Sequence, residues 1–312
     1  MAIKRVRWLL RTCLIAGFLL LLQSGCNKVP VALGGSRFRL VIGSKGHDDG
    51  QFNRPRGITF DVTRDEFFVV DWDGRVQHFT LDGKWLNSWF MPEVINGKPE
   101  EVFLTPEDTI LVADTHYSQI LEYSRDGELL NRFGELGTEP GQFIYPVGVC
   151  MDPEGFVWVS EYGQNDRVQK LTREGMPILV IGETGYDPGQ FQRPSGIKVS
   201  DDRLLYVADA VNHRVQVFSL EGELVRVIGE EGRGPGQFLY PYDLAIRENA
   251  LYVLEYGGQR IQKLTLTGEF LDSYGERGSG DGQFAAPWRM TDYTDGLLVS
   301  DTNNNRVILV HF

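Results

Sequence analysis

The sequence contains little cysteine and little histidine. Three of its 312 residues are cysteine and five are histidine. Cys13 and Cys26 lie near the N-terminus, which leaves Cys150 without a partner and excludes a disulfide framework. The absence of C-x-x-C pairs excludes a zinc RING domain. Cys150 lies in the apolar run VGVCM, which predicts a buried structural thiol rather than a nucleophile.

Long apolar segments are scarce too, and the one near the N-terminus is too short to span a bilayer. Residues 12–22 form an apolar run of 11 residues, whereas a transmembrane helix needs about 20. The run follows four basic residues, namely Lys4, Arg5, Arg7 and Arg11. This order is typical of a secretory signal peptide.

The signal-like segment ends in LLQSGC at Cys26. This ending resembles the bacterial lipobox, although Gln23 stands where that motif prefers leucine. The resemblance predicts a signal peptide over residues 1–26, lipidation of Cys26 and a tether over residues 27–37. It implies an exported protein, held on a membrane of the bacterial cell envelope by a lipid anchor. An ordinary cleaved signal and an uncleaved N-terminal anchor are the alternatives.

Basic residues are outnumbered by acidic ones. Removal of residues 1–25 leaves 27 basic and 43 acidic residues, a net charge of −16. Such a charge repels phosphate backbones, which disfavours broad nucleic-acid binding.

What the sequence has in abundance is repetition. The phrase G-Q-F occurs five times, starting at Gly50, Gly141, Gly189, Gly236 and Gly282. The last four copies are 46 to 48 residues apart, and the first gap is about twice as long. A second phrase, of the type VADAVNHRVQVF (207–218), occurs six times. Six repeats therefore fit, and one has lost its G-Q-F. The chain there reads WFMPEVINGKPEEV (89–102), which is either a partner-binding lip or simple drift.

Each repeat contains about four short runs in which Val, Ile, Tyr and Phe alternate with polar residues, and no helical period interrupts them. Four strands per repeat of about 46 residues indicate a propeller blade. We predict an all-β, six-bladed β-propeller over residues 38–312, which we expect to be a monomer. The run FRLVIG (38–43) resembles LVRVIG (224–229), so we expect this N-terminal strand to complete the last blade and close the ring.

The repeat resembles the NHL repeat. Pro194-Ser195-Gly196-Ile197, followed by Val207-Ala208-Asp209 and Asn212-His213-Arg214-Val215, matches its pattern closely, and the resemblance covers nearly all of residues 38–312. It likewise implies a six-bladed propeller.

Positions that recur in every blade are interpreted as structural. An acidic residue ends each second strand and is predicted to accept hydrogen bonds from a neighbouring turn and to pair with the arginine that follows in most blades. These acids are Asp71, Asp114, Glu161, Asp209, Glu255 and Asp301. The G-Q-F phrase is interpreted as a joint between blades, in which Gly supplies an unusual backbone angle and Phe fills the gap.

Positions where the blades differ are the candidate site. The two residues after each blade's proline begin the innermost strands, and four contiguous blades place charged or aromatic residues there. The candidate ligand-binding residues are Arg56, Glu100, Glu101, Tyr242, Asp243, Trp288 and Arg289. Charges of both signs with two aromatic rings predict a site at the axial mouth of the propeller for a small polar ligand, a peptide or a glycan. The alternative is a salt-bridged plug that binds nothing.

Catalysis is the rival function. Some NHL propellers resemble lyases with axial histidines on zinc and a bound calcium, and related lactonases hold calcium at the mouth. Zinc requires converging imidazoles, but the histidines of this chain do not share a register. Glu100, Glu101 and Asp243 offer carboxylates for calcium, but Arg56 and Arg289 would oppose a cation. We therefore predict no catalytic residue and no cofactor, with calcium as the open alternative, and expect a binding module.

Overall fold

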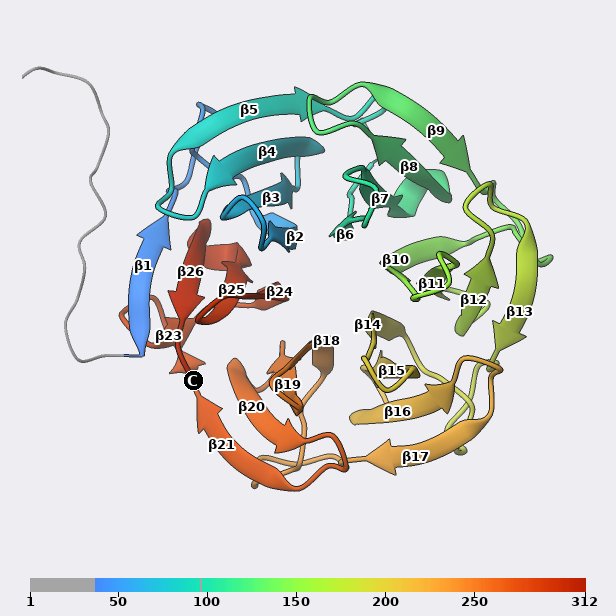
Figure 1. Cartoon of the computed structure of the whole chain (residues 1–312). Coiled ribbons are helices and arrows are strands. Elements are labelled where there is room, and N and C mark those ends of the chain that lie inside the picture. The colour runs from blue at the N-terminus through green and yellow to red at the C-terminus, as the bar shows by residue number, and fades with distance from the viewer. Residues whose placement is uncertain (1–36, 96) are drawn as a thin grey trace, which may run out of the picture.

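The computed structural model describes residues 37–95 and 97–312, and the predicted signal peptide and Cys26 lie outside the described residues. Six four-stranded antiparallel sheets form a ring around a central axis (Figure 1). The predicted six-bladed β-propeller is therefore confirmed. The described residues contain no helix with the length and apolar character needed to cross a bilayer.

The first three blades follow one another along the chain, each from the axis outward. Blade 1 contains β2 (Pro55–Asp61), β3 (Glu66–Asp71), β4 (Arg75–Thr80) and β5 (Trp85–Phe90). Blade 2 contains β6 (Glu101–Leu104), β7 (Ile110–Asp114), β8 (Gln119–Tyr123) and β9 (Leu129–Phe133), with the 3-10 turn η1 (Thr115–Tyr117). Blade 3 contains β10 (Tyr145–Met151), β11 (Val157–Tyr162), β12 (Arg167–Leu171) and β13 (Pro177–Ile181).

The remaining blades repeat this order. Blade 4 contains β14 (Pro194–Val199), β15 (Leu204–Asp209), β16 (Arg214–Ser219) and β17 (Leu224–Ile228). Blade 5 contains β18 (Pro241–Arg247), β19 (Ala250–Glu255), β20 (Arg260–Thr265) and β21 (Phe270–Tyr274). Blade 6 contains β24 (Pro287–Tyr293), β25 (Gly296–Asp301), η2 (Thr302–Asn304) and β26 (Arg306–Val310), preceded by the short pair β22 (Glu276–Arg277) and β23 (Gln283–Phe284).

The outer strand of blade 6 comes from the other end of the chain. β1 (Phe38–Ile42) pairs antiparallel with β26, with Val41 opposite Ile308 and Ile42 opposite Val307 (Figure 1). The His311 N–H also donates to the Arg37 carbonyl at 2.7 Å. The predicted closure is confirmed, and the β26 edge that would otherwise be open is paired.

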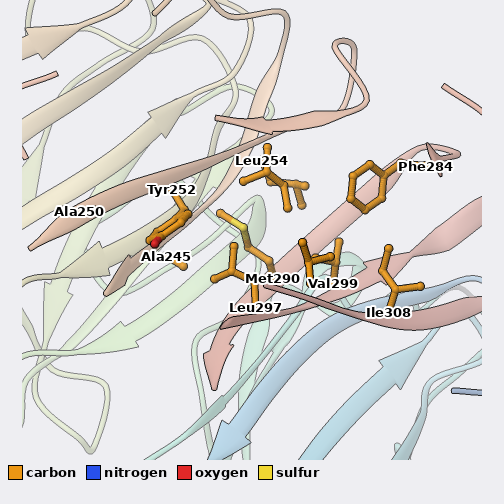
Figure 2. Close-up of a cluster of buried hydrophobic side chains, with 11 residues drawn as sticks. Ala245, Ala250, Tyr252, Leu254, Phe284, Met290, Leu297, Val299 and Ile308 are labelled. Atoms are coloured by element: carbon orange, nitrogen blue, oxygen red, sulfur yellow. The ribbon is translucent and has the colours of Figure 1, made fainter. Parts of the chain in front are cut away.

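The hydrophobic core is divided among the seams between neighbouring blades. Figure 2 shows the seam between blades 5 and 6, where Tyr252 and Leu254 of β19 face Met290, Val299 and Ile308 of blade 6. The G-Q-F phenylalanine Phe284 packs in the same cluster. Five seams hold such a phenylalanine, and each of the five is fully buried: Phe52, Phe143, Phe191, Phe238 and Phe284.

Blade 4 illustrates how the joint works. Phe191 packs between residues of blades 3 and 4. The Gln190 carbonyl accepts bonds from Arg214 Nη2 at 2.8 Å and Gln216 Nε2 at 2.7 Å. The Gly189 N–H donates to Gln216 Oε1 at 2.8 Å, and Gly189 has a left-handed φ of 89°. The predicted joint is confirmed, because the connector is both inserted between two blades and hydrogen-bonded to the second.

A second glycine, Gly182, makes room for the Phe191 ring. A Cβ atom on Gly182, which has a φ of 82°, would lie 2.3 Å from the Phe191 ring. No side chain fits there without displacing the ring, so the phenylalanine requires this glycine.

The seam between blades 1 and 2 lacks the phrase and is filled in another way. Met91 is buried there, 3% exposed, among Phe68, Val112 and Leu121. In the same connector Ile95 is 93% exposed. The eroded joint therefore keeps an apolar filler, supplied by a flexible methionine rather than a phenylalanine.

Removal of one joint side chain tests the importance of the seams. Phe191→Ala leaves a cavity between blades 3 and 4, and we expect the free energy of unfolding to fall by about 3–5 kcal/mol. Tyr186→Ala is the matched control on the same connector, where the side chain is 74% exposed, and we expect a change within about 0.5 kcal/mol. Urea unfolding followed by fluorescence measures both. Equal effects would contradict the role of Phe191.

Candidate functional site

The acidic residues at the ends of the second strands belong to the joints. Asp209 has no exposed surface. It accepts the Gln192 N–H at 2.8 Å and pairs with Arg214 Nε at 2.8 Å. Equivalent contacts to the connector and the arginine occur at Asp71, Glu161, Glu255 and Asp301. The structural interpretation of these five acids is confirmed.

Blade 2 departs from this pattern. Asp114 has no arginine partner in the described structure and accepts instead from Gln119 Nε2 at 3.0 Å, while its Oδ1 atom is buried without a hydrogen bond. Burial raises the pKa of Asp114 to about 6. The lost joint phrase and the lost arginine coincide in one blade, because the arginine serves the connector that is missing there.

Asp114 therefore predicts a pH dependence of stability. Its pKa is higher in the folded chain than the ordinary value of 3.8, so folding favours the protonated acid. The stability that the protonated acid contributes is fully present below about pH 4 and is lost as pH rises to about 6. At pH 7, Asp114→Asn should raise the free energy of unfolding by about 1–3 kcal/mol. Denaturant unfolding at pH 4 and pH 7 measures this.

The equivalent residue of blade 4 is the control. Asp209→Asn breaks the buried pair with Arg214, so at pH 7 this variant should lose about 3 kcal/mol or more. A loss of stability in both variants would contradict the difference that we infer between the two blades.

The inner strands carry the predicted site residues to the axis through β-bulges. The pairing of the innermost strand with its neighbour shifts register just after the proline in five blades, for example between Pro241 and Asp243 and between Pro287 and Met290. A bulge adds a residue on one strand and re-aims the side chains beside it. The variable positions after the proline therefore lie where the strands meet the axis.

The structure brings all seven predicted residues together. Six of them are at most 6% exposed, and Trp288 is half-buried. Carboxylates and guanidinium groups alternate within this cluster, which we call the axial plug: Arg56, Glu100, Glu101, Tyr242, Asp243, Trp288 and Arg289.

Arg289 is the centre of the axial plug and reaches four other blades. Its guanidinium donates to the carbonyl oxygens of Val147 at 2.7 Å, Tyr242 at 2.7 Å and Glu100 at 3.2 Å. It also donates to Ser195 Oγ at 2.9 Å and pairs with Glu101 Oε2 at 3.0 Å. The planar fork of arginine suits such a set of acceptors, and a lysine ammonium does not.

Arg56 of β2 joins the one remaining blade, blade 1, to this centre. It pairs with Glu100 and lies between two indole rings, 4.4 Å from the centroid of Trp72 and 4.4 Å from that of Trp288. Trp288 Nε1 donates to the other Glu100 oxygen at 2.5 Å. Glu100 is therefore bound by a guanidinium and an indole N–H at once.

Further charged groups adjoin this pair. Burial raises the pKa of Glu101, and the Arg289 guanidinium opposes that shift. Asp243 Oδ2 accepts the Met290 N–H at 2.7 Å, while Oδ1 has no hydrogen-bond partner. Burial disfavours the charge on Lys198 of β14, but Glu101 and Asp243 raise its pKa overall. The positive and negative groups of the axial plug thus largely neutralise one another, as in the plug alternative.

Stability tests the role of Arg289. Arg289→Lys keeps the charge but loses most of the acceptors, so the free energy of unfolding should fall by about 3 kcal/mol or more. Arg277→Lys, at an exposed arginine of β22, is the control and should change it by about 0.5 kcal/mol at most. If both variants unfold at the same urea concentration, Arg289 does not hold the blades together.

Above the axial plug lies a ring of aromatic side chains, most of which the sequence analysis missed. Neighbouring rings contact one another, with centroids 5.3 Å apart for Tyr145 and Tyr162 and 5.5 Å apart for Tyr256 and Trp288. Seven residues form what we call the axial rim: Trp72, His116, Tyr145, Tyr162, Tyr242, Tyr256 and Trp288. Arg54, Lys98 and Arg193 lie over its rings and are the cations of the rim.

A sequence signal for part of the axial rim exists. Trp72, Tyr162 and Tyr256 directly follow the acidic residue at the end of a second strand. The other three blades have Thr115, Ala210 and Thr302 at this position. The rule that variable positions mark the site, applied to this position as well, would have found these three aromatic residues.

The carboxylates of the axial plug do not fit a calcium site. Glu100 is bound by Arg56 and Trp288, Glu101 by Arg289, and Asp243 by a backbone N–H. A cation there would have to displace guanidinium groups that already neutralise these oxygens. Within residues 37–95 and 97–312, no group of three or more His, Cys, Asp or Glu side chains is arranged to hold a metal ion.

Cys150 is confirmed as a structural residue. Its thiol is 1% exposed between blades 3 and 4, beside Trp158 and Ile197. Burial raises the pKa of Cys150 to about 12, which keeps the thiol protonated at neutral pH.

Comparison with known proteins places the fold. A family model described as "6-bladed beta-propeller" matches residues 183–275, which contain blades 4 and 5. The chain is a six-bladed propeller. No curated protein matches it significantly.

Solved structures resemble it at low sequence identity. A protein of unknown function from Bacteroides thetaiotaomicron has a TM-score of 0.66 at 16% identity, over 86% of this chain and 74% of that one. Virginiamycin B lyase from Staphylococcus aureus has a TM-score of 0.60 at 15% identity, over 83% and 95%. A putative gluconolactonase has a TM-score of 0.63 at 15% identity, over 86% and 92%. At such identities, the likeness establishes the propeller fold alone.

Proposed function

We propose that this chain is an NHL-type propeller that acts as a binding module, with the axial rim as its ligand-binding face. The observation that carries the proposal is the combination of a rigid plug and an aromatic rim. The charges of the axial plug largely neutralise one another, so in this proposal the plug supports a surface rather than reacting. The axial rim above it offers flat rings, with Tyr145 37% exposed and Tyr256 36% exposed.

The chemistry of the rim suits a small polar ligand, a peptide or a glycan. Aromatic rings provide rigid contact area at low entropic cost, and their faces stack on planar groups and sugar rings. Half-buried Trp288 and exposed Tyr256 lie edge to face, which leaves ring surface available beside a fixed indole. In this proposal, Trp288 and Tyr242 of the axial plug also support the rim, whereas Arg289, Glu101 and Asp243 only support its floor.

The second part of the proposal concerns location. The basic segment, the apolar run and the lipobox-like LLQSGC support export and a lipid anchor at Cys26. Detergent phase partitioning of bacterial membranes tests this: the native chain should enter the detergent phase and Cys26→Ser the aqueous phase. Equal partitioning would reject the anchor.

Metal-dependent catalysis is the weaker alternative. The lyase and lactonase folds among the similar structures are its support. The carboxylates of the axial plug are engaged with arginines, so we derive no metal-dependent step from them.

A ligand screen tests the binding function. Trp72 and Trp288 of the axial rim flank Arg56, so quenching of tryptophan fluorescence should report binding of sugars, peptides and small acids. Tyr256→Ala should weaken any ligand found by about tenfold, since an aromatic contact contributes about 0.5–1.5 kcal/mol beyond its area. Tyr186→Ala, off the axis, is the control and should leave the affinity unchanged. Binding that is indifferent to Tyr256 would reject the axial rim as the site.

A further inference from the structure

The charges at the axial rim are unlike those of the rest of the molecule. The chain without residues 1–25 has a net charge of −16, yet the rim carries three cations with no ion pair among the described residues: Arg54, Lys98 and Arg193. Most other arginines that the structure describes, such as Arg167 and Arg214, are paired with a carboxylate. Unpaired cations around one rim favour a complementary anion.

These cations are fixed by the aromatic rings. Arg54 lies 5.0 Å and Lys98 4.2 Å from the Trp72 ring centroid. Arg193 lies 4.6 Å from the ring of Tyr162 and 5.6 Å from that of Tyr242, on the opposite part of the rim. A cation over a ring face is held in position but keeps its hydrogen-bond donors free for another partner.

The backbone also presents two of them. Arg54 and Arg193 directly precede the prolines of blades 1 and 4 and have left-handed φ angles of 54° and 55°. Tyr240 and Ala286 have the same conformation in blades 5 and 6, with φ of 51° each. The fold therefore offers this position in four connectors, and this chain uses two of them for arginine.

His116 of the axial rim lies close enough to the cations Lys98 and Arg56 for them to affect its pKa. Partial burial lowers the pKa of His116, Lys98 and Arg56 lower it further, and only Glu100 opposes them. The one acid of the axial plug closest to the rim, Glu100, is already bound by Arg56 and Trp288. Burial raises the pKa of Asp166, and Arg193 opposes this shift through its charge and its backbone N–H, but the two side chains form no ion pair. The net charge presented at the rim is positive.

We propose that the axial rim binds a carboxylate carried on a ring, as in an acidic sugar or an aromatic acid. This inference rests on the proposed binding function and names its ligand class. The ring of the ligand stacks on Tyr256 or Trp288. Its carboxylate accepts hydrogen bonds from Arg193, which lies over the neighbouring Tyr242 ring. Lys98, on the opposite part of the rim, adds a longer-range attraction. The strongly acidic remainder of the protein repels long polyanions, so the anion recognised is short.

The experiment uses the full-length protein and two matched pairs of probes. A galacturonic acid dimer is compared with a galactose dimer, and phenylacetate with phenylacetamide, by calorimetry and tryptophan fluorescence. In at least one pair, the acid should bind about tenfold more tightly than its neutral partner, because a hydrogen bond to a charged group is stronger than a neutral one. The pair that responds distinguishes sugar from aromatic acid. The preference should shrink as salt is raised, because exposed charges are screened.

Variants separate charge from packing. Arg193→Gln should remove most of the preference for the acid, whereas Arg193→Lys should retain much of it. Lys98→Gln, which removes a charge on the opposite part of the rim, should reduce the preference less. Arg277→Gln, an exposed arginine on β22, is the control and should retain all of it. Near-ultraviolet circular dichroism checks that each variant keeps its fold.

The outcomes separate this inference from the function on which it rests. If neutral ligands bind as tightly as acids, and their affinity is unchanged by Arg193→Gln but weakened by Tyr256→Ala, the anionic ligand class is rejected and the proposed binding function is retained. Failure of both acids to bind also rejects the proposal of an anionic ligand. A ligand whose affinity is unchanged by Tyr256→Ala rejects the axial rim as the binding site, and with it the proposed function.

Discussion

The Arg289 guanidinium lies at the axis and hydrogen-bonds to blades 2, 3, 4 and 5 from its own blade 6. Arg56 brings blade 1 into the same cluster through Glu100. A ring of blades tends to leave polar strand ends unpaired around its axis, and burying them without partners is unfavourable. Arginine provides enough donors at fixed angles to satisfy several of these carbonyls at once. The aromatic surface above it depends on this arrangement, because Trp288 and Tyr242 adjoin groups that Arg289 and Arg56 hold.

The joints between blades also provide hydrogen-bond partners for buried polar groups, farther from the axis. Each complete joint combines an apolar filler between two blades, such as Phe191, with a connector bound by the acid and arginine of the next blade. Blade 2 shows that these features belong to one unit. Where the G-Q-F phrase is missing, the arginine is missing too, Met91 fills the seam and Asp114 Oδ1 is left buried without a hydrogen bond. The irregular connector of this blade contributes Lys98 to the axial rim.

The repeat pattern made the fold predictable. Strand alternation, the 46 to 48 residue spacing and the strand-like FRLVIG each have a local physical cause, so they can be read without a structure. The seven axial residues were also found from sequence, because they differ among blades that are otherwise alike. Trp72 and Tyr162 were missed because the residue after each second-strand acid was not compared among the blades. Arg193 was missed because it precedes the repeated proline, and its place beside the aromatic rings depends on the arrangement of the blades in a circle.

The sequence by itself determined that blades form, how many there are, and which positions vary at the axis. Only the tertiary structure decided what those positions do together. Glu100 and Arg289 are 189 residues apart, and Arg56 lies 44 residues before Glu100, so their pairing depends on ring closure. Closure brings opposite charges into a region with little water, where they neutralise one another, and leaves Lys98 and Arg193 above them without such partners. Local patterns encode each strand, but the balance of charge at the axis is a sum over all six blades.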